Sequence, residues 1–162
     1  MRTQIKRKRQ RKTDYKARIA LLKSGIPRIV IRLTNKYIVL QSVESDQAQD
    51  KITLEVSSKD LLKNGWDEKF KGSLKSLPAA YLTGLVFAKK IGKGEFIVDT
   101  GLAVHKPKNR IYSSVNGLVD GGLKVHVDPA VFPAKERLEG KHMKEELQTM
   151  ILKIKSTMEK NG

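Results

Sequence analysis

The chain has 162 residues, of which 39% are hydrophobic, enough for one domain with a modest core. It carries 33 Lys and Arg against 17 Asp and Glu, and a net charge of +16 favours a polyanionic partner, first nucleic acid and second an acidic membrane. The absence of Cys excludes disulfides and cysteine zinc sites, and no apolar run approaches a membrane span. No apolar segment follows the basic N-terminus as in a signal peptide, so a cytoplasmic protein is expected.

The positive charge lies in two zones of the chain. Residues 1–36 hold 13 basic side chains and one acid, and residues 69–110 hold nine basic and two acidic ones. The intervening residues 37–68 have a net charge of −4, and residues 111–162 a net charge of +1. Such asymmetry is typical of a binding face.

The N-terminal residues 1–12 contain only Met1 and Ile5 as large apolar side chains, so a disordered basic arm is expected there. Thr13 or Asp14 can cap a helix that ends at Gly25.

A hairpin pattern follows. Ile29 and Ile31 alternate with Arg28 and Arg32, which places the two arginines on the face that the core does not use. Asn35 and Lys36 provide a tight turn into a second strand. A third strand, residues 51–58, has Ile52, Leu54 and Val56 on one face.

The second half of the chain alternates helices with short strands. Residues 58–66 predict a short helix that ends at Gly65, and residues 67–73 a charged loop. The main buried helix covers residues 73–91, with Pro78 in its first turn and a thin side suited to packing on a sheet. Its thin side consists of Ala79, Ala80, Gly84 and Ala88.

Residues 96–99 predict a strand buried on both faces, and residues 110–120 a helix that stops at Gly121. Residues 124–127 are a candidate last strand, and a long amphipathic helix follows Pro133. The pattern indicates an α/β fold with a mixed β-sheet and flanking helices. The apolar stripe of the last helix is Met143, Leu147, Met150, Ile151, Ile154 and Met158.

The Asp-Thr-Gly sequence at residues 99–101 matches an aspartic-protease half-site. Such an enzyme needs two carboxylates that share a proton, and this chain has one such motif, followed by cations that would keep both ionised. The alternative is that Asp99 ends a strand and bonds to the turn backbone, with Gly101 at an unusual φ.

The spacing of the histidines and glycines does not support a metal site or a nucleotide-binding loop. His105, His126 and His142 match no metal motif, and there is no glycine-rich phosphate cradle, so no catalytic residue, metal or cofactor is expected. Four aromatic residues are candidates for stacking on RNA bases or, alternatively, for partial burial in the core. They are Tyr15, Tyr37, Trp66 and Phe70.

An ordered set of segments runs along the chain: RKTDYKAR at 11–18, IRLTNKYI at 31–38 with Gln41, PAAYLTGLVFAKK at 78–90, VDTGL at 98–102, NGLVDGGL at 116–123 and VFP at 131–133. In this order they resemble the 5S rRNA-binding large-subunit ribosomal proteins of the L-eighteen family, in its archaeal form.

The resemblance implies a ribonuclease-H-like topology without catalysis. It also implies that the protein binds 5S rRNA and attaches it to the large-subunit rRNA at the central protuberance, beside neighbouring ribosomal proteins. The expected organisation is a basic arm (1–12), an α/β RNA-binding core (13–132) and a C-terminal helical extension (133–162).

Candidate RNA-binding residues come from the arm, the arm's base, the hairpin and the loop after the Asp-Thr-Gly turn. A dimeric aspartic protease using Asp99 and a general basic RNA chaperone remain as alternatives. The candidates are Arg7, Lys8, Arg9, Arg11, Lys12, Tyr15, Arg18, Arg28, Arg32, Asn35, Lys36, His105, Lys106, Lys108 and Arg110.

Overall fold

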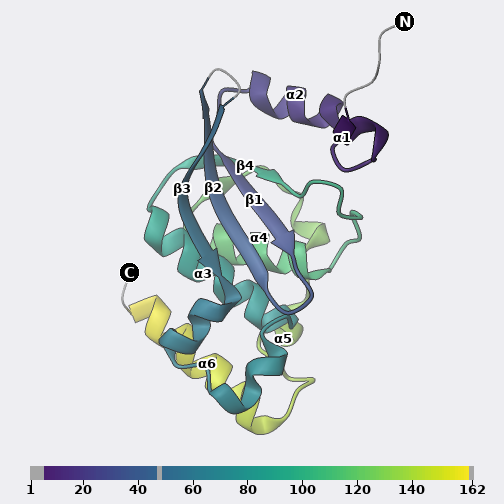
Figure 1. Ribbon diagram of the computed structural model, residues 1–162. Coiled ribbons are helices and arrows are strands. Elements are labelled where there is room, and N and C mark those ends of the chain that lie inside the picture. Colours follow the sequence, from purple (N-terminus) through teal and green to yellow (C-terminus); the bar gives the residue numbers. More distant parts are fainter. Residues whose placement is uncertain (1–5, 47–48, 161–162) are drawn as a thin grey trace, which may run out of the picture.

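The computed structural model of the protein describes residues 6–46 and 49–160, with side chains through Met158 (Figure 1). Helices flank a five-stranded sheet. The strands are β1 (Arg28–Leu33), β2 (Ile38–Asp46), β3 (Gln49–Ser57), β4 (Glu95–Asp99) and β5 (Lys124–Val125). The α-helices are α1 (Lys6–Arg9), α2 (Tyr15–Lys23), α3 (Leu77–Ile91), α4 (Arg110–Asp120), α5 (Lys135–Leu138) and α6 (Glu145–Lys160). Three 3-10 helices are η1 (Ser58–Asn64), η2 (Glu68–Ser73) and η3 (Pro129–Val131).

The sheet is mixed, with the strand order β3-β2-β1-β4-β5. β1, β2 and β3 form the predicted antiparallel meander, and β4 and β5 continue the sheet in parallel with β1. Ile31 of β1 pairs with Leu40 of β2, and Val30 pairs with Asp99 of β4. The predicted α/β class with a mixed sheet is therefore confirmed.

One face of the sheet carries the core. Ile29 and Ile31 are buried as their alternation predicts, together with Leu40 and Val56 of the neighbouring strands. Helices α3 and α4 lie behind this face in Figure 1. Among the described residues, no helix combines the length and the apolar character needed to cross a membrane.

Helix α3 is buried on every side. Ser76 caps its N-terminus by accepting from Ala79 N, Pro78 lies in the first turn, and every residue from 78 to 88 is buried. Burial around the whole circumference requires partners on several sides, and these are the sheet, α4 and the C-terminal helices. The predicted main helix is confirmed, although it begins at Leu77 and not at residue 73.

The thin side of α3 faces a helix, whereas the sequence predicted a sheet. A methyl group on Gly84 would lie 2.2 Å from the carbonyl oxygen of Ser114, and one on Gly117 would lie 2.1 Å from that of Tyr81. The backbones of α3 and α4 therefore touch at these two glycines. The sequence could not distinguish the two partners, because a glycine permits close approach to either.

The third strand departs from the expected pattern. Val56 is buried, but Leu54 is half-buried and Ile52 is 53% exposed. The β2–β3 ribbon extends beyond α3 and α4 toward α2 at the top of Figure 1, and its pairing register shifts between Ser42 and Val43. The outer part of β3 thus lies beyond the two helices behind the core face of the sheet.

The C-terminal region contains two helices instead of one, because Gly140 adopts a φ of 77° between α5 and α6. The predicted apolar stripe is present on α6 from Leu147 onward, and Met143 precedes the helix. Leu147, Ile151, Ile154 and Met158 are buried in the same cluster as the α3 side chains. In β4 only Phe96 is buried, so the prediction of burial on both faces is wrong for the rest of that strand.

Residues 6–9 of the arm form one helical turn, where the sequence predicted disorder. Its four basic side chains are exposed, and none of these four residues is buried. The predicted N-cap of α2 is confirmed, since Asp14 accepts from Lys16 N and Ala17 N. Residues 1–5 lie outside the described part of the chain.

Candidate nucleic-acid interface

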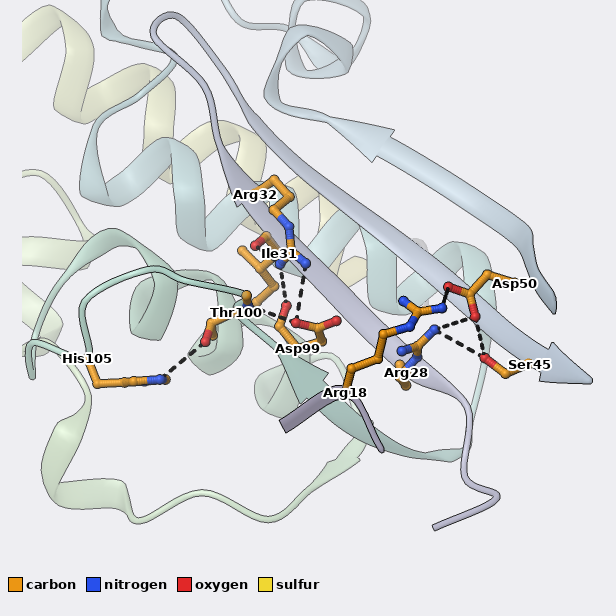
Figure 2. A network of polar contacts seen from close by, with 10 residues as sticks. Arg18, Arg28, Ile31, Arg32, Ser45, Asp50, Asp99, Thr100 and His105 are labelled. Atoms are coloured by element: carbon orange, nitrogen blue, oxygen red, sulfur yellow. Dashed lines mark hydrogen bonds and ion pairs between the residues drawn. The ribbon is translucent and has the colours of Figure 1, made fainter. Parts of the chain in front are cut away.

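Asp99 closes the turn that ends β4. Its Oδ1 accepts from Gly101 N at 2.7 Å, and Gly101 has a φ of 63°. Arg32 of β1 donates to the carbonyl of Asp99 at 2.8 Å and to its Oδ1 at 3.3 Å (Figure 2). Asp99 thus bonds to a backbone amide and a guanidinium, which confirms its predicted role in the turn.

The loop after this turn presents its cations to solvent. His105, Lys106 and Lys108 are all exposed. The His105 ring lies 3.4 Å from Thr100 Oγ1, and Lys108 N donates to the carbonyl of Val131 at 2.8 Å. The backbone of the loop is therefore attached to the fold, while its basic side chains remain available.

Arg28 is not on the surface, contrary to the prediction. Only 2% of it is exposed, and its Nη2 donates to Asp50 Oδ1 at 2.7 Å and to Ser45 Oγ at 3.1 Å. The face of β1 that carries Arg28 points away from the main core as expected. The β2–β3 ribbon supplies both partners, and so this end of the face is covered.

The same carboxylate also binds Arg18 of α2, at 2.8 Å (Figure 2). Partial burial by itself raises the pKa of Asp50, but hydrogen bonds from Ser45 and Arg18 and the charges of Arg28 and Arg18 outweigh it. The pKa therefore lies below its ordinary value of 3.8. Since α2 has no buried residue, this ion pair is a main attachment of the helix to the sheet.

A cleft with four basic side chains lies at the β1–β2 turn, and we name it the cationic cleft. Asn35 and Lys36 come from the turn, Lys71 and Lys75 from the segment around η2, and Arg110 from the start of α4. The cleft measures about 720 Å³, the size of a small-ligand site. The fold thus brings Lys36 of the first basic zone together with Arg110 of the second.

The cations of this cleft are unneutralised. None of the ten described residues that line it is acidic. Within residues 6–46 and 49–160, none of Lys36, Lys71, Lys75 and Arg110 forms an ion pair with a carboxylate. Lys75 donates only to the carbonyl of Asn35, at 3.4 Å. This contrasts with Arg18, Arg28 and Arg32, which are all paired.

Lys71 and Lys75 were not among the candidates. The one signal for them was the excess charge of residues 69–110, which does not say which lysines share a surface. The cleft lies at the end of β1, and α2 precedes the start of this strand. At about 3.3 Å per residue, the six residues of β1 give a length of roughly 20 Å between these two points.

The arm cations from Lys6 to Lys12 are exposed, and one of them bonds to the residue that follows the arm: Arg7 Nε donates to Thr13 Oγ1 at 2.9 Å. Among the aromatic candidates, Trp66 is buried and its Nε1 donates to the carbonyl of Phe70, so it cannot stack on a base. Tyr37 is half-buried at the edge of the cationic cleft. Tyr15 is half-buried at the start of α2.

The histidines lie in separate places. His126 is 3.2 Å from Glu95, and His105 lies beside Thr100. In the part of the chain that the structure describes, no group of three or more His, Cys, Asp and Glu is arranged to hold a metal ion.

The chain is similar in sequence to known proteins of the large ribosomal subunit. A model of the family described as "Ribosomal large subunit proteins 60S L5, and 50S L18" matches residues 1–94. The protein named "Large ribosomal subunit protein uL18" of Methanoculleus marisnigri is 42% identical over 144 residues, which are 87% of this chain and 80% of that protein. Proteins of the same name from Korarchaeum cryptofilum and Methanoregula boonei are 40% and 38% identical over 142 residues each. The alignments cover 86% of this chain and 71% and 79% of those proteins.

Proposed function

Because the chain belongs to the uL18 family of large ribosomal subunit proteins, we propose that it binds 5S rRNA and attaches it to the large rRNA at the central protuberance. In this role it is a structural constituent of the cytoplasmic ribosome, not an enzyme. Its fold holds basic side chains in place against RNA, and no chemical step is involved.

The observation that carries the proposal is the cationic cleft. Four cations from three remote segments converge there with no carboxylate among the described lining residues. Gathering unneutralised like charges is unfavourable in the isolated chain and becomes favourable when a phosphate backbone enters and releases its counterions.

We assign the other basic groups by their accessibility. The arm residues Arg7, Lys8, Arg9, Arg11 and Lys12 bind phosphates along one part of the RNA, and the loop residues His105, Lys106 and Lys108 bind another. Arg32, 44% exposed at its side chain, binds from the sheet between these regions. Arg28 supports Asp50 from within the fold and makes no direct contact.

The experiment is to purify the chain from its own cells with and without ribonuclease and to sequence the RNA that accompanies it. A single small rRNA is the expected result. A mixed RNA population would favour the general RNA chaperone, and no RNA in either sample would refute both functions. The bonds of Asp99 to Gly101 and Arg32 argue against the protease alternative.

A further inference from the structure

A second cleft lies on the helical side of the molecule, and we name it the helical cleft. It is about 910 Å³ and opens between the C-terminal ends of α3 and α4 and the helices α5 and α6. It has no lining residue in common with the cationic cleft. The RNA-binding proposal makes no use of it.

Lys89 of α3 is the unusual group in this cleft. Its Nζ is buried and has no hydrogen-bond partner among the described residues. No described carboxylate forms an ion pair with it either. Lys89 lies in the last turn of α3, where the helix dipole attracts a cation, but an ammonium group shielded from water still requires acceptors for its hydrogens. Most buried polar groups in proteins have a hydrogen-bond partner, so this ammonium group is a candidate for a partner outside the chain.

The acidic groups of the cleft are not that partner. Asp120 accepts a 2.8 Å hydrogen bond from the Tyr81 hydroxyl, and Glu139 forms no ion pair within the described residues. The Nζ of Lys155 lies 5.7 Å from the centre of the Tyr81 ring. The side chains in place therefore leave the charge of Lys89 uncompensated.

The lining identifies the class of partner. Apolar side chains form one part of the cleft, including Leu138, Ile151 and Met158, while lysines and two acids occupy the rest. A surface for a phosphate backbone carries basic charge without acids, as the cationic cleft does. Apolar side chains combined with charged groups of both signs are instead typical of a protein–protein interface.

We propose that the helical cleft binds a segment of a neighbouring protein in which an Asp or Glu lies between apolar residues. The carboxylate accepts from Lys89 Nζ, and the apolar side chains cover Leu138, Ile151 and Met158. This inference goes beyond RNA binding and assigns the helical side of the molecule to a protein partner.

The test uses the assembled large subunit. The chain has no cysteine, so Lys93→Cys at the edge of the cleft provides a single attachment site for a benzophenone label. Labelled chain replaces the native copy in large subunits, and the cross-linked peptide is sequenced after illumination. The control is Lys90→Cys, on the exposed neighbour that does not line the cleft.

We expect the label at position 93, but not at position 90, to reach a protein segment that carries an acid among apolar residues. Lys89→Met, combined with the same label, lowers the yield of this cross-link about tenfold because the buried carboxylate loses its partner. Lys90→Met leaves the yield unchanged, and neither substitution alters affinity for 5S rRNA, which separates this proposal from the RNA-binding one. Cross-links to rRNA alone, to the chain itself or to nothing, or an equal yield with Lys89→Met, would overturn it.

Discussion

Arg28 donates a 2.7 Å hydrogen bond to Asp50, and this contact joins β1 to β3 across the strand between them. The guanidinium is almost fully buried, and its Nε and Nη1 have no partner among the described residues. Asp50 is thus the carboxylate that neutralises a buried charge, and it also attaches α2 through Arg18.

Replacing Asp50 by Asn is expected to destabilise the fold. Arg28 would keep its buried charge without a carboxylate, at a cost of about 2 kcal/mol, below the value for fully buried pairs because Asp50 is 30% exposed. Urea unfolding measures the difference. Asp46→Asn, on the same ribbon but in no ion pair within the described residues, should change stability little. Equal losses in the two variants would contradict the assignment.

The same carboxylate predicts a pH dependence. The folded pKa of Asp50 lies below its ordinary value of 3.8, so the folded state favours the ionised form. The stability from Asp50 is therefore fully present above pH 3.8 and is lost as the pH falls through the lower, folded value. The difference in unfolding free energy between the native chain and Asp50→Asn should stay constant near neutral pH and shrink in acid. If this free-energy difference grew on acidification, the direction assigned to the pKa shift of Asp50 would be wrong.

Gly117→Ala tests the contact between α3 and α4. The added methyl would lie 2.1 Å from the backbone carbonyl of Tyr81, so the helices must separate, at a cost of about 3 kcal/mol. Gly72→Ala is the control, because a methyl there meets no atom within 4 Å. Thermal unfolding of both variants should show a marked decrease for Gly117→Ala alone.

The cationic cleft predicts a change in salt dependence. Lys71→Gln with Lys75→Gln removes two phosphate contacts, so the slope of log affinity for 5S rRNA against log salt should become shallower by about 1 to 2. Lys59→Gln with Lys63→Gln makes the same charge change on η1, outside the cleft. Filter binding at several salt concentrations compares the pairs. The same decrease in slope for both would show that net charge matters and the cleft does not.

Deleting residues 1–12 is expected to leave the domain folded. The deletion removes seven cations, and the helical turn within it has no buried residue. The midpoint of thermal unfolding should therefore stay near that of the full chain, while RNA affinity falls and its salt slope becomes shallower. Circular dichroism and binding on the same samples provide both measurements. Loss of the folded signal would assign the arm a structural role.

Features determined by neighbouring residues were predictable from the sequence. The turn at Asp99 follows from an Asp before a Gly at a strand end, and the cap at Asp14 follows from an acid before a helical pattern. The alternation of Ile29 and Ile31 likewise predicted which side of β1 faces the hydrophobic core.

Features that depend on distant segments were not predictable. Arg28 is buried because the β2–β3 ribbon passes over it, and nothing near Arg28 in the sequence indicates where that ribbon extends. Lys71 and Lys75 join Lys36 only through the tertiary arrangement. The packing of Gly84 on α4 rather than on the sheet has the same origin.

The burial of α3 on every side has a consequence for synthesis. A ribosome synthesises the chain from its N-terminus, so the apolar residues 78–88 leave the exit tunnel before α4 does. They leave it well before the α6 residues that complete the cluster around them, which are Ile151, Ile154 and Met158. Until the last turns of α6 are translated, part of this surface has no cover. The nascent chain therefore passes through a period of aggregation risk in which a chaperone that shields apolar segments is of most benefit.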